Sequence, residues 1–264
     1  MGRARVKALM EMRFPEVEWS GEEKPVLIVD GRLVRLPDVG AGMRGEAAYA
    51  VGWNERTFPT LCRHLRVLRL QLYELRVADL GPLTQLRGLR ELAITWDTKV
   101  TSLDPLAELA DLEVLVLEDL PKVRSIEPLR SLTKLVALDY SGGIWDRSRA
   151  LTLEPLADLP LLEELWLTNM RVDEGGLRPL AGCPSLRRLQ VSNRFETADY
   201  AYLAAKRPDI ECDHFAPWIA VGVAGADRMV VGRRKPFLDS RKDGERIARY
   251  EQEFERLKQE FADD

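Results

Sequence analysis

The stretch SLDPLAELADLEVLVLEDL, residues 102–120, decides the fold because its leucines change spacing part-way along. Leucine recurs first in steps of three residues and then in a final step of two, at positions 103, 106, 109, 112, 115 and 117. An amphipathic helix keeps its helical period throughout, and a half-buried strand alternates throughout. The stretch therefore predicts a tight helical turn that passes into a short strand within one unit.

The same unit recurs along the chain. The dipeptide Pro-Leu begins at residues 82, 105, 128, 155 and 179, at intervals of 23, 23, 27 and 24 residues. Aligned on it, the segments read LGPLTQLRGLRELAI, LDPLAELADLEVLVL, IEPLRSLTKLVALDY, LEPLADLPLLEELWL and LRPLAGCPSLRRLQV. An irregular sixth copy precedes them, with Cys62, Leu65, Leu68 and Leu70 expected in register. A fixed period of this length indicates a solenoid of stacked units.

Each unit has a direct physical interpretation. The last two leucines, such as Leu115 and Leu117, occupy alternate strand positions and point to the same side, while those before them line a helical or 3-10 turn. Proline suits the first position of that turn because its missing N–H is not needed there, and Asp104 before Pro105 is expected to cap it. One unit cannot bury its own apolar stripe, so the units must stack into a parallel sheet.

These segments resemble leucine-rich repeats, in particular the short repeats of the bacterial internalin-like class, which carry an apolar-x-Pro-Leu step before Leu-x-x-Leu-x-Leu. The resemblance covers residues 60–213 and implies an α/β solenoid: an arc with parallel strands on its concave face, short helical or 3-10 turns on its convex side, and non-repeat caps at both ends. The asparagine that normally follows the strand is absent here. In its place stand Tyr73, Asp97, Leu120, Gly143, Met170 and Arg194.

Three parts are therefore expected: an N-terminal cap over residues 1–60, a repeat array over 61–213 with about six repeats and a degenerate last unit, and a C-terminal cap over 214–264. The first cap contains VLIVDGRLVRL, whose Asp30-Gly31 pair between alternating runs predicts a β-hairpin. The last cap is expected to hold strands and an amphipathic helix with the stripe Ile247, Tyr250, Phe254, Leu257 and Phe261. This helix either docks on the array or mediates self-association or partner binding through residues 245–261.

Composition restricts the class of protein. The 264 residues carry a formal net charge of −4 with acidic and basic residues interleaved, so no global field indicates nucleic acid or an anionic membrane. The chain has no long apolar run, and its start lacks the apolar region of a secretory signal. We expect a soluble, cytoplasmic protein. Arginine outnumbers lysine, a bias typical of GC-rich bacterial genomes.

Catalytic chemistry has little support in the sequence. Cys62, Cys183 and Cys212 form no Cys-x-x-Cys pair, and the first two lie in a leucine column, where they are expected to fill the core. Cys62 and His64 invite a nucleophile hypothesis, but only the cysteine faces inward in the expected register. Glycine-rich phosphate loops and the HExxH motif are absent from the sequence. We predict a protein that is not an enzyme and has no cofactor and no metal.

The functional surface is expected on the concave face, on residues that flank the inward strand leucines. Its middle is predicted to be acidic and to expose valines and tryptophans. The 27-residue interval adds a loop at residues 141–150, and insertions in solenoids often lie on the binding face. The candidate partner-binding residues are Glu91, Trp96, Glu118, Asp119, Asp139, Trp145, Glu164, Trp166 and Asn169.

This surface predicts binding of a protein partner with a basic surface, because rigid aromatic side chains make good contact residues and carboxylates repel phosphates. An adaptor, a regulator or the immunity partner of a toxin would fit the resemblance. The alternative is binding of nucleic acid or an anionic surface through the basic C-terminal segment, which contains Arg228, Arg233, Arg234, Lys235, Arg241 and Lys242.

Overall fold

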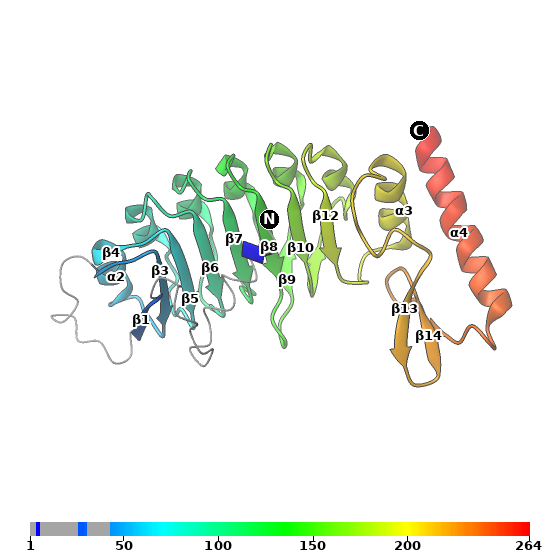
Figure 1. Ribbon diagram of the computed structural model, residues 1–264, viewed down its shortest axis with the longest axis horizontal. Helices are drawn as coiled ribbons and strands as arrows, with labels where there is room; N and C mark the ends of the chain where they lie inside the picture. Colours follow the sequence, from blue (N-terminus) through cyan, green and yellow to red (C-terminus); the bar gives the residue numbers. More distant parts are fainter. Residues whose placement is uncertain (1–3, 6–25, 31–42) are drawn as a thin grey trace.

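The computed structural model describes residues 4–5, 26–30 and 43–264, and most of these residues belong to one curved array (Figure 1). Within the described residues an eight-stranded sheet runs through the array, and each strand pairs in parallel with the next. In spatial order its strands are β1 (Val26–Asp30), β3 (Ala47–Val51), β5 (Arg69–Tyr73), β6 (Glu91–Thr95), β7 (Val114–Glu118), β8 (Ala137–Ser141), β10 (Glu164–Leu167) and β12 (Arg188–Val191).

A short 3-10 helix precedes each of the strands β6, β7, β8, β10 and β12, on the opposite side of the array from the concave face. These helices are η2 (Gly81–Gln85), η3 (Asp104–Glu108), η4 (Glu127–Ser131), η5 (Glu154–Asp158) and η6 (Arg178–Gly182), each with proline in its first turn. The expected cap at Asp104 is wrong. Asp104 instead donates its backbone N–H to Ser102 Oγ at 3.0 Å, and Ser125 and Thr152 make the equivalent contact in later repeats.

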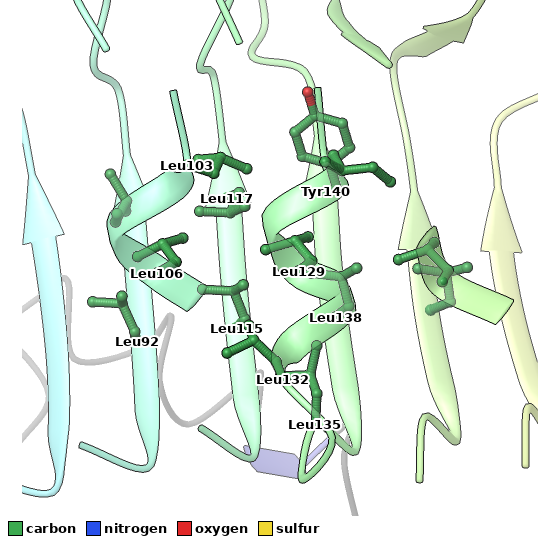
Figure 2. Packing of buried hydrophobic residues seen from close by; sticks show 14 of the residues in the cluster. Leu92, Leu103, Leu106, Leu115, Leu117, Leu129, Leu132, Leu135, Leu138 and Tyr140 are labelled. Carbon is green, nitrogen blue, oxygen red and sulfur yellow. The ribbon is translucent and has the colours of Figure 1, made fainter. Parts of the chain in front are cut away.

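The core lies between the strands and these turns. Leu115 and Leu117 of β7 face Leu106 of η3 and Leu129 of η4, and all four side chains are fully buried (Figure 2). Burying one leucine stabilises the folded state by about 1.5–3 kcal/mol, and the array repeats this contact in every unit. The fold is a leucine-rich-repeat solenoid, as the sequence predicts.

The first repeat differs from the predicted register by two residues. Leu70 pairs with Leu92 and Leu72 with Ile94, so Leu70 and Leu72 are the inward strand leucines. Leu68, expected inward, is 45% exposed. The shift arises because this repeat has an α-helix, α2 (Phe58–His64), and then β4 (Leu65–Arg66), which pairs with β2 (Met43–Arg44) before the main strand begins.

Asp97 occupies one of the positions where the expected asparagine is missing, and it performs a similar task. Its side chain is fully buried and accepts hydrogen bonds from the backbone N–H groups of Val77 at 3.2 Å, Lys99 at 2.6 Å and Val100 at 3.0 Å. Burial raises the pKa of this carboxyl, while the three N–H groups act in the opposite direction. Asp97 thus joins two successive repeats through their backbones.

The array begins before residue 61. Both β1 and β3 continue the parallel sheet, so residues assigned to the N-terminal cap include strands of the solenoid itself. The first arm of the expected hairpin is β1, which pairs with β3 in parallel. Residues 31–42, which contain the expected turn and second arm, lie outside the described residues.

The C-terminal end of the array is covered by helices and a small sheet. After α3 (Thr197–Lys206) come the antiparallel strands β13 (Trp218–Val223), β14 (Ala226–Val230) and β15 (Phe237–Leu238). Helix α4 (Gly244–Asp263) packs against α3. Phe254 is buried, the Phe261 ring meets the Tyr202 ring at 5.4 Å, and Arg178 lies 5.3 Å from both rings. The apolar stripe of α4 is therefore turned toward the array.

Candidate functional site

The nine predicted binding residues separate into two groups. Four lie on strands within the concave sheet face: Glu91, Asp139, Glu164 and Trp166. The other five lie where strands end and the following loops begin: Trp96, Glu118, Asp119, Trp145 and Asn169. Because parallel strands end at the same edge of a sheet, this second group shares one edge, which we call the strand-end edge.

The sheet-face group is largely covered within the chain. Glu91 is buried, and its Oε1 accepts a hydrogen bond from Arg5 Nε at 2.7 Å. The same guanidinium donates to Glu113 Oε2 at 2.9 Å. Residues 4–5 accordingly lie against the middle of the sheet, although they are far away in sequence (Figure 1). Neither spacing nor composition indicated this contact of Arg5.

The part of this face on β10 and β12 is also covered by contacts within the chain. Glu164 is fully buried and forms an ion pair with Arg188, while Trp166 Nε1 donates to Gln190 Oε1 at 2.9 Å. Trp166 also packs against a second apolar cluster, separate from the main core and fully buried, made of Ala93, Val114, Val116 and Ala137. The expectation that the valines of this face are exposed is wrong, because their concave side is covered.

Asp139 is the sheet-face residue with the most perturbed chemistry. It lies in the middle of β8, is partly buried, and accepts a hydrogen bond from Ser141 Oγ. Burial raises the pKa of Asp139 to about 6, the Ser141 hydroxyl opposes this rise, and the nearby Glu118 carboxylate adds to it. On the concave face, the ionised form of Asp139 is therefore less stable than it would be in water.

The strand-end edge has a recurring backbone geometry. The residue just beyond the strand has a positive φ in several repeats, with values of 69° at Gly52, 54° at Glu74, 61° at Trp96 and 58° at Asp119. These residues extend the ladder, since each donates its N–H to the neighbouring strand. A bulky residue is disfavoured at such a φ, so the repeat imposes this conformation on Trp96. The repeat geometry thus fixes the direction of the side chains along this edge.

Three aromatic rings form a row that ends at this edge. The Tyr49 and Tyr73 rings are 6.4 Å apart and stacked, and the Tyr73 and Trp96 rings are 5.7 Å apart. Trp96 is the open end of the row, with 46% of its surface exposed. Sequence reasoning found Trp96 and missed the tyrosines, although aligning the ends of successive strands would have brought Tyr73 next to it.

The loop at residues 142–147 is the most exposed part of the strand-end edge. It connects β8 to β9 (Ser148–Ala150), which pairs in parallel with β11 (Met170–Val172), and it projects past the neighbouring strands (Figure 1). Ile144 and Trp145 are 90% and 91% exposed. The 27-residue repeat interval led to Trp145 as a candidate binding residue, whereas Ile144 was not among the candidates. Two large apolar side chains thus stand almost entirely in water.

Contacts at the base of this loop fix its conformation. Asn169 Nδ2 donates to the carbonyl oxygens of Gly143 at 2.6 Å and Asp146 at 3.3 Å. A side chain at Gly142 would place its Cβ 2.2 Å from the Asn169 carbonyl oxygen, and one at Gly143 would lie 2.3 Å from Asp119 Cγ. Asn169 is therefore a positioning residue, and both glycines are needed for the close approach.

Acidic groups surround the loop. Asp119 is partly buried, and its Oδ1 has no hydrogen-bond partner. Burial raises the pKa of Asp119, and the Asp146 carboxylate raises it further. The edge therefore combines exposed apolar residues with the carboxylates of Asp119 and Asp146.

The basic C-terminal segment has a different character. Arg228 lies over the Trp218 ring at 4.0 Å and pairs with Asp227, and Arg233 pairs with Glu196. Lys235 pairs with Glu253, and Arg241 and Lys242 both pair with Asp239. Phosphate binding would have to compete with these carboxylates, so the geometry does not favour the nucleic-acid alternative.

The three cysteines are protonated thiols at neutral pH, which makes them poor nucleophiles. Cys62 and Cys183 are fully buried, and Cys212 is partly buried. Burial raises the pKa of all three thiols to about 12, so thiolate is scarce. Among residues 4–5, 26–30 and 43–264, no cluster of three or more His, Cys, Asp or Glu could hold a metal ion. None of the helices in this part of the chain combines the length and apolarity that crossing a membrane requires.

Similarity to known proteins is found among solved structures. No family model and no curated protein matches the chain. Among solved structures, it is similar to an internalin (inlF) from Listeria monocytogenes, at 19% identity and a TM-score of 0.46 over 66% of this chain and 45% of that one. An internalin C2 (inlC2) of the same species is similar at 21% identity and a TM-score of 0.45, over 61% of this chain and 65% of that one. This chain thus spans less than two thirds of either internalin, and the likeness adds nothing beyond the fold that the strand pairing defines.

Proposed function

We propose that this chain is a non-catalytic protein-binding module whose partner docks on the strand-end edge, from Trp96 to the loop at 142–147. The observation that carries the proposal is the pair Ile144 and Trp145, about 90% exposed on a loop whose base is fixed by Asn169. An exposed aromatic residue held in one conformation loses little entropy on binding, which is how hot spots are made.

The partner is proposed to be basic where it meets this edge. Asp119 and Asp146 lie beside the exposed apolar pair, and the pKa of Asp119 is already raised by burial and by Asp146. A cation from the partner would lower that pKa and gain a charge-assisted hydrogen bond. A phosphate backbone or an anionic membrane would be repelled.

The test compares capture of proteins from the native organism by the wild-type chain and by two edge variants, Trp96→Ala and Trp145→Ala. We expect each variant to weaken a specific partner by about 2 kcal/mol, which is the loss typical of a central aromatic contact. Affinity is then measured with the purified partner by calorimetry. Both side chains are exposed, so the variants should keep the thermal unfolding midpoint of the wild type.

Leu161→Ala serves as the matched control, because Leu161 is also a large apolar residue, 49% exposed, away from the strand-end edge. It should leave the captured partner unchanged. Retention of every specific partner by both edge variants would show that the strand-end edge is not the binding surface. Equal loss in the control would mean that binding depends on general surface apolarity.

A further inference from the structure

A second feature of the surface is complementary to the loop at 142–147 in apolar character and charge. A hollow of about 400 Å³ lies beside the first two complete repeats, where Leu65, Val67 and Leu86 contribute to its lining. Leu68 also lines it and is 45% exposed, because the first repeat is shifted by two residues from the regular register. We call this feature the apolar hollow. Its size suits one or two large apolar side chains.

Two arginines stand at the apolar hollow. Arg66 and Arg87 line it and are both exposed. The Arg66 guanidinium is held in place, since its Nη1 donates to the carbonyl oxygens of Arg63 at 2.8 Å and Leu65 at 2.7 Å. In the described part of the chain, neither Arg66 nor Arg87 pairs with a carboxylate. Within the described residues, the apolar hollow thus combines an apolar interior with two arginines that form no ion pair.

The loop at 142–147 has the complementary pattern. Ile144 and Trp145 provide the apolar side chains, and Asp146 follows them directly with an exposed carboxylate. An apolar pair with an adjacent acid fits an apolar hollow with adjacent arginines. Charge complementarity of this kind favours one register over others and raises the rate of association.

One molecule cannot join its own two features. The apolar hollow precedes the first residues of β5 and β6, Arg69 and Glu91, while the loop follows the last residue of β8, Ser141. Since all these strands are parallel, the two features lie at opposite edges of the sheet. A contact between the two features therefore requires two copies of the chain.

We propose that this protein associates with itself head to tail, with Ile144 and Trp145 of one copy inserted into the apolar hollow of the next and Asp146 against Arg66 and Arg87. The proposal deepens the proposed function, because it rests on the loop being a binding site and names a second copy as its basic partner. The contact uses different patches on the two copies, so it can propagate into chains or close into a ring. A single loop in a hollow buries little area, so the association is weak and concentration-dependent.

Sedimentation equilibrium of the full chain tests the proposal over protein concentrations from micromolar to several hundred micromolar. The wild type is expected to rise in average mass with concentration, past that of a dimer. Trp145→Ala, which lacks the inserted side chain, and Leu68→Glu, which places a charge in the hollow, should each weaken association at least tenfold. Both changes are at exposed positions, and circular dichroism confirms that each variant is folded.

Mixing the two variants gives the decisive measurement. Trp145→Ala keeps an intact hollow and Leu68→Glu keeps an intact loop, so an equimolar mixture should form a one-to-one dimer and nothing larger. A contact that joined loop to loop or hollow to hollow would not produce this result, because one of the two variants would carry its defect into the mixed pair. The proposal would be overturned if the wild type stayed monomeric at every concentration or if neither variant weakened its association. It would also be overturned if the mixture of the two variants formed no dimer.

The same variants separate this proposal from the proposed function. Leu68→Glu alters the hollow and leaves the strand-end edge intact, so it should weaken self-association at least tenfold while a different captured partner is retained. Loss of such a partner in Trp145→Ala, with a wild type that is monomeric at all concentrations, would sustain the proposed function and refute the head-to-tail contact. If Trp145→Ala associates with itself like the wild type, and both edge variants retain every captured partner, both proposals are refuted.

Discussion

Replacing Asp97 with alanine is expected to lower the free energy of unfolding by about 3 kcal/mol, because buried N–H groups lose their acceptor. The carboxylate accepts from Val77, Lys99 and Val100, and the Val77 and Val100 bonds are buried. Relief of the unfavourable burial of the charge offsets part of the loss, which is why the expected effect is below the sum of three hydrogen bonds. Urea unfolding at pH 7 measures it.

Two further variants make this measurement specific. Asp97→Asn should have a smaller effect, since its one oxygen still accepts from Lys99 and Val100 while its amide group faces the Val77 N–H. Asp111→Ala, at an exposed ion pair with Lys134, should leave the stability almost unchanged. If Asp97→Ala unfolds at the urea concentration of the wild type, the repeats do not depend on this carboxylate.

Asp97 also shows how far the sequence could predict the fold. Leucine spacing and the Pro-Leu interval determine the strands and 3-10 turns, because every unit buries the same stripe. The absence of asparagine from its usual column was evident, yet the substitute could be found only with the backbone in view. The shifted register at Leu68 was missed for a related reason: α2 and β4 occupy residues that a regular repeat does not have.

The candidate site was less predictable because it depends on contacts between distant residues. The strand pattern placed Glu91 and Val114 on the concave face correctly, but it could not show that this face is covered. The ion pairs of Arg5 with Glu91 and Glu113 join residues 86 and 108 positions apart. The 27-residue interval between Pro-Leu dipeptides predicted the loop that contains residues 142–147. The exposure of Ile144 depends on how Asn169 holds the base of that loop.

Changing Asp139 to asparagine is expected to stabilise the protein at pH 7.5, by about 2–3 kcal/mol. The pKa of Asp139 is about 6 in the folded state, above the ordinary value of 3.8, so the folded protein holds this proton more tightly than the unfolded chain does. Its contribution to stability is therefore fully present below pH 4 and is lost as the pH rises through 6. Asparagine stays neutral and can still accept from Ser141.

Thermal or urea unfolding of both proteins between pH 4 and pH 8 tests this sign. The difference in stability should be close to zero at pH 4 and grow until the pH exceeds 6. A difference that stays constant over this pH range would refute the linkage.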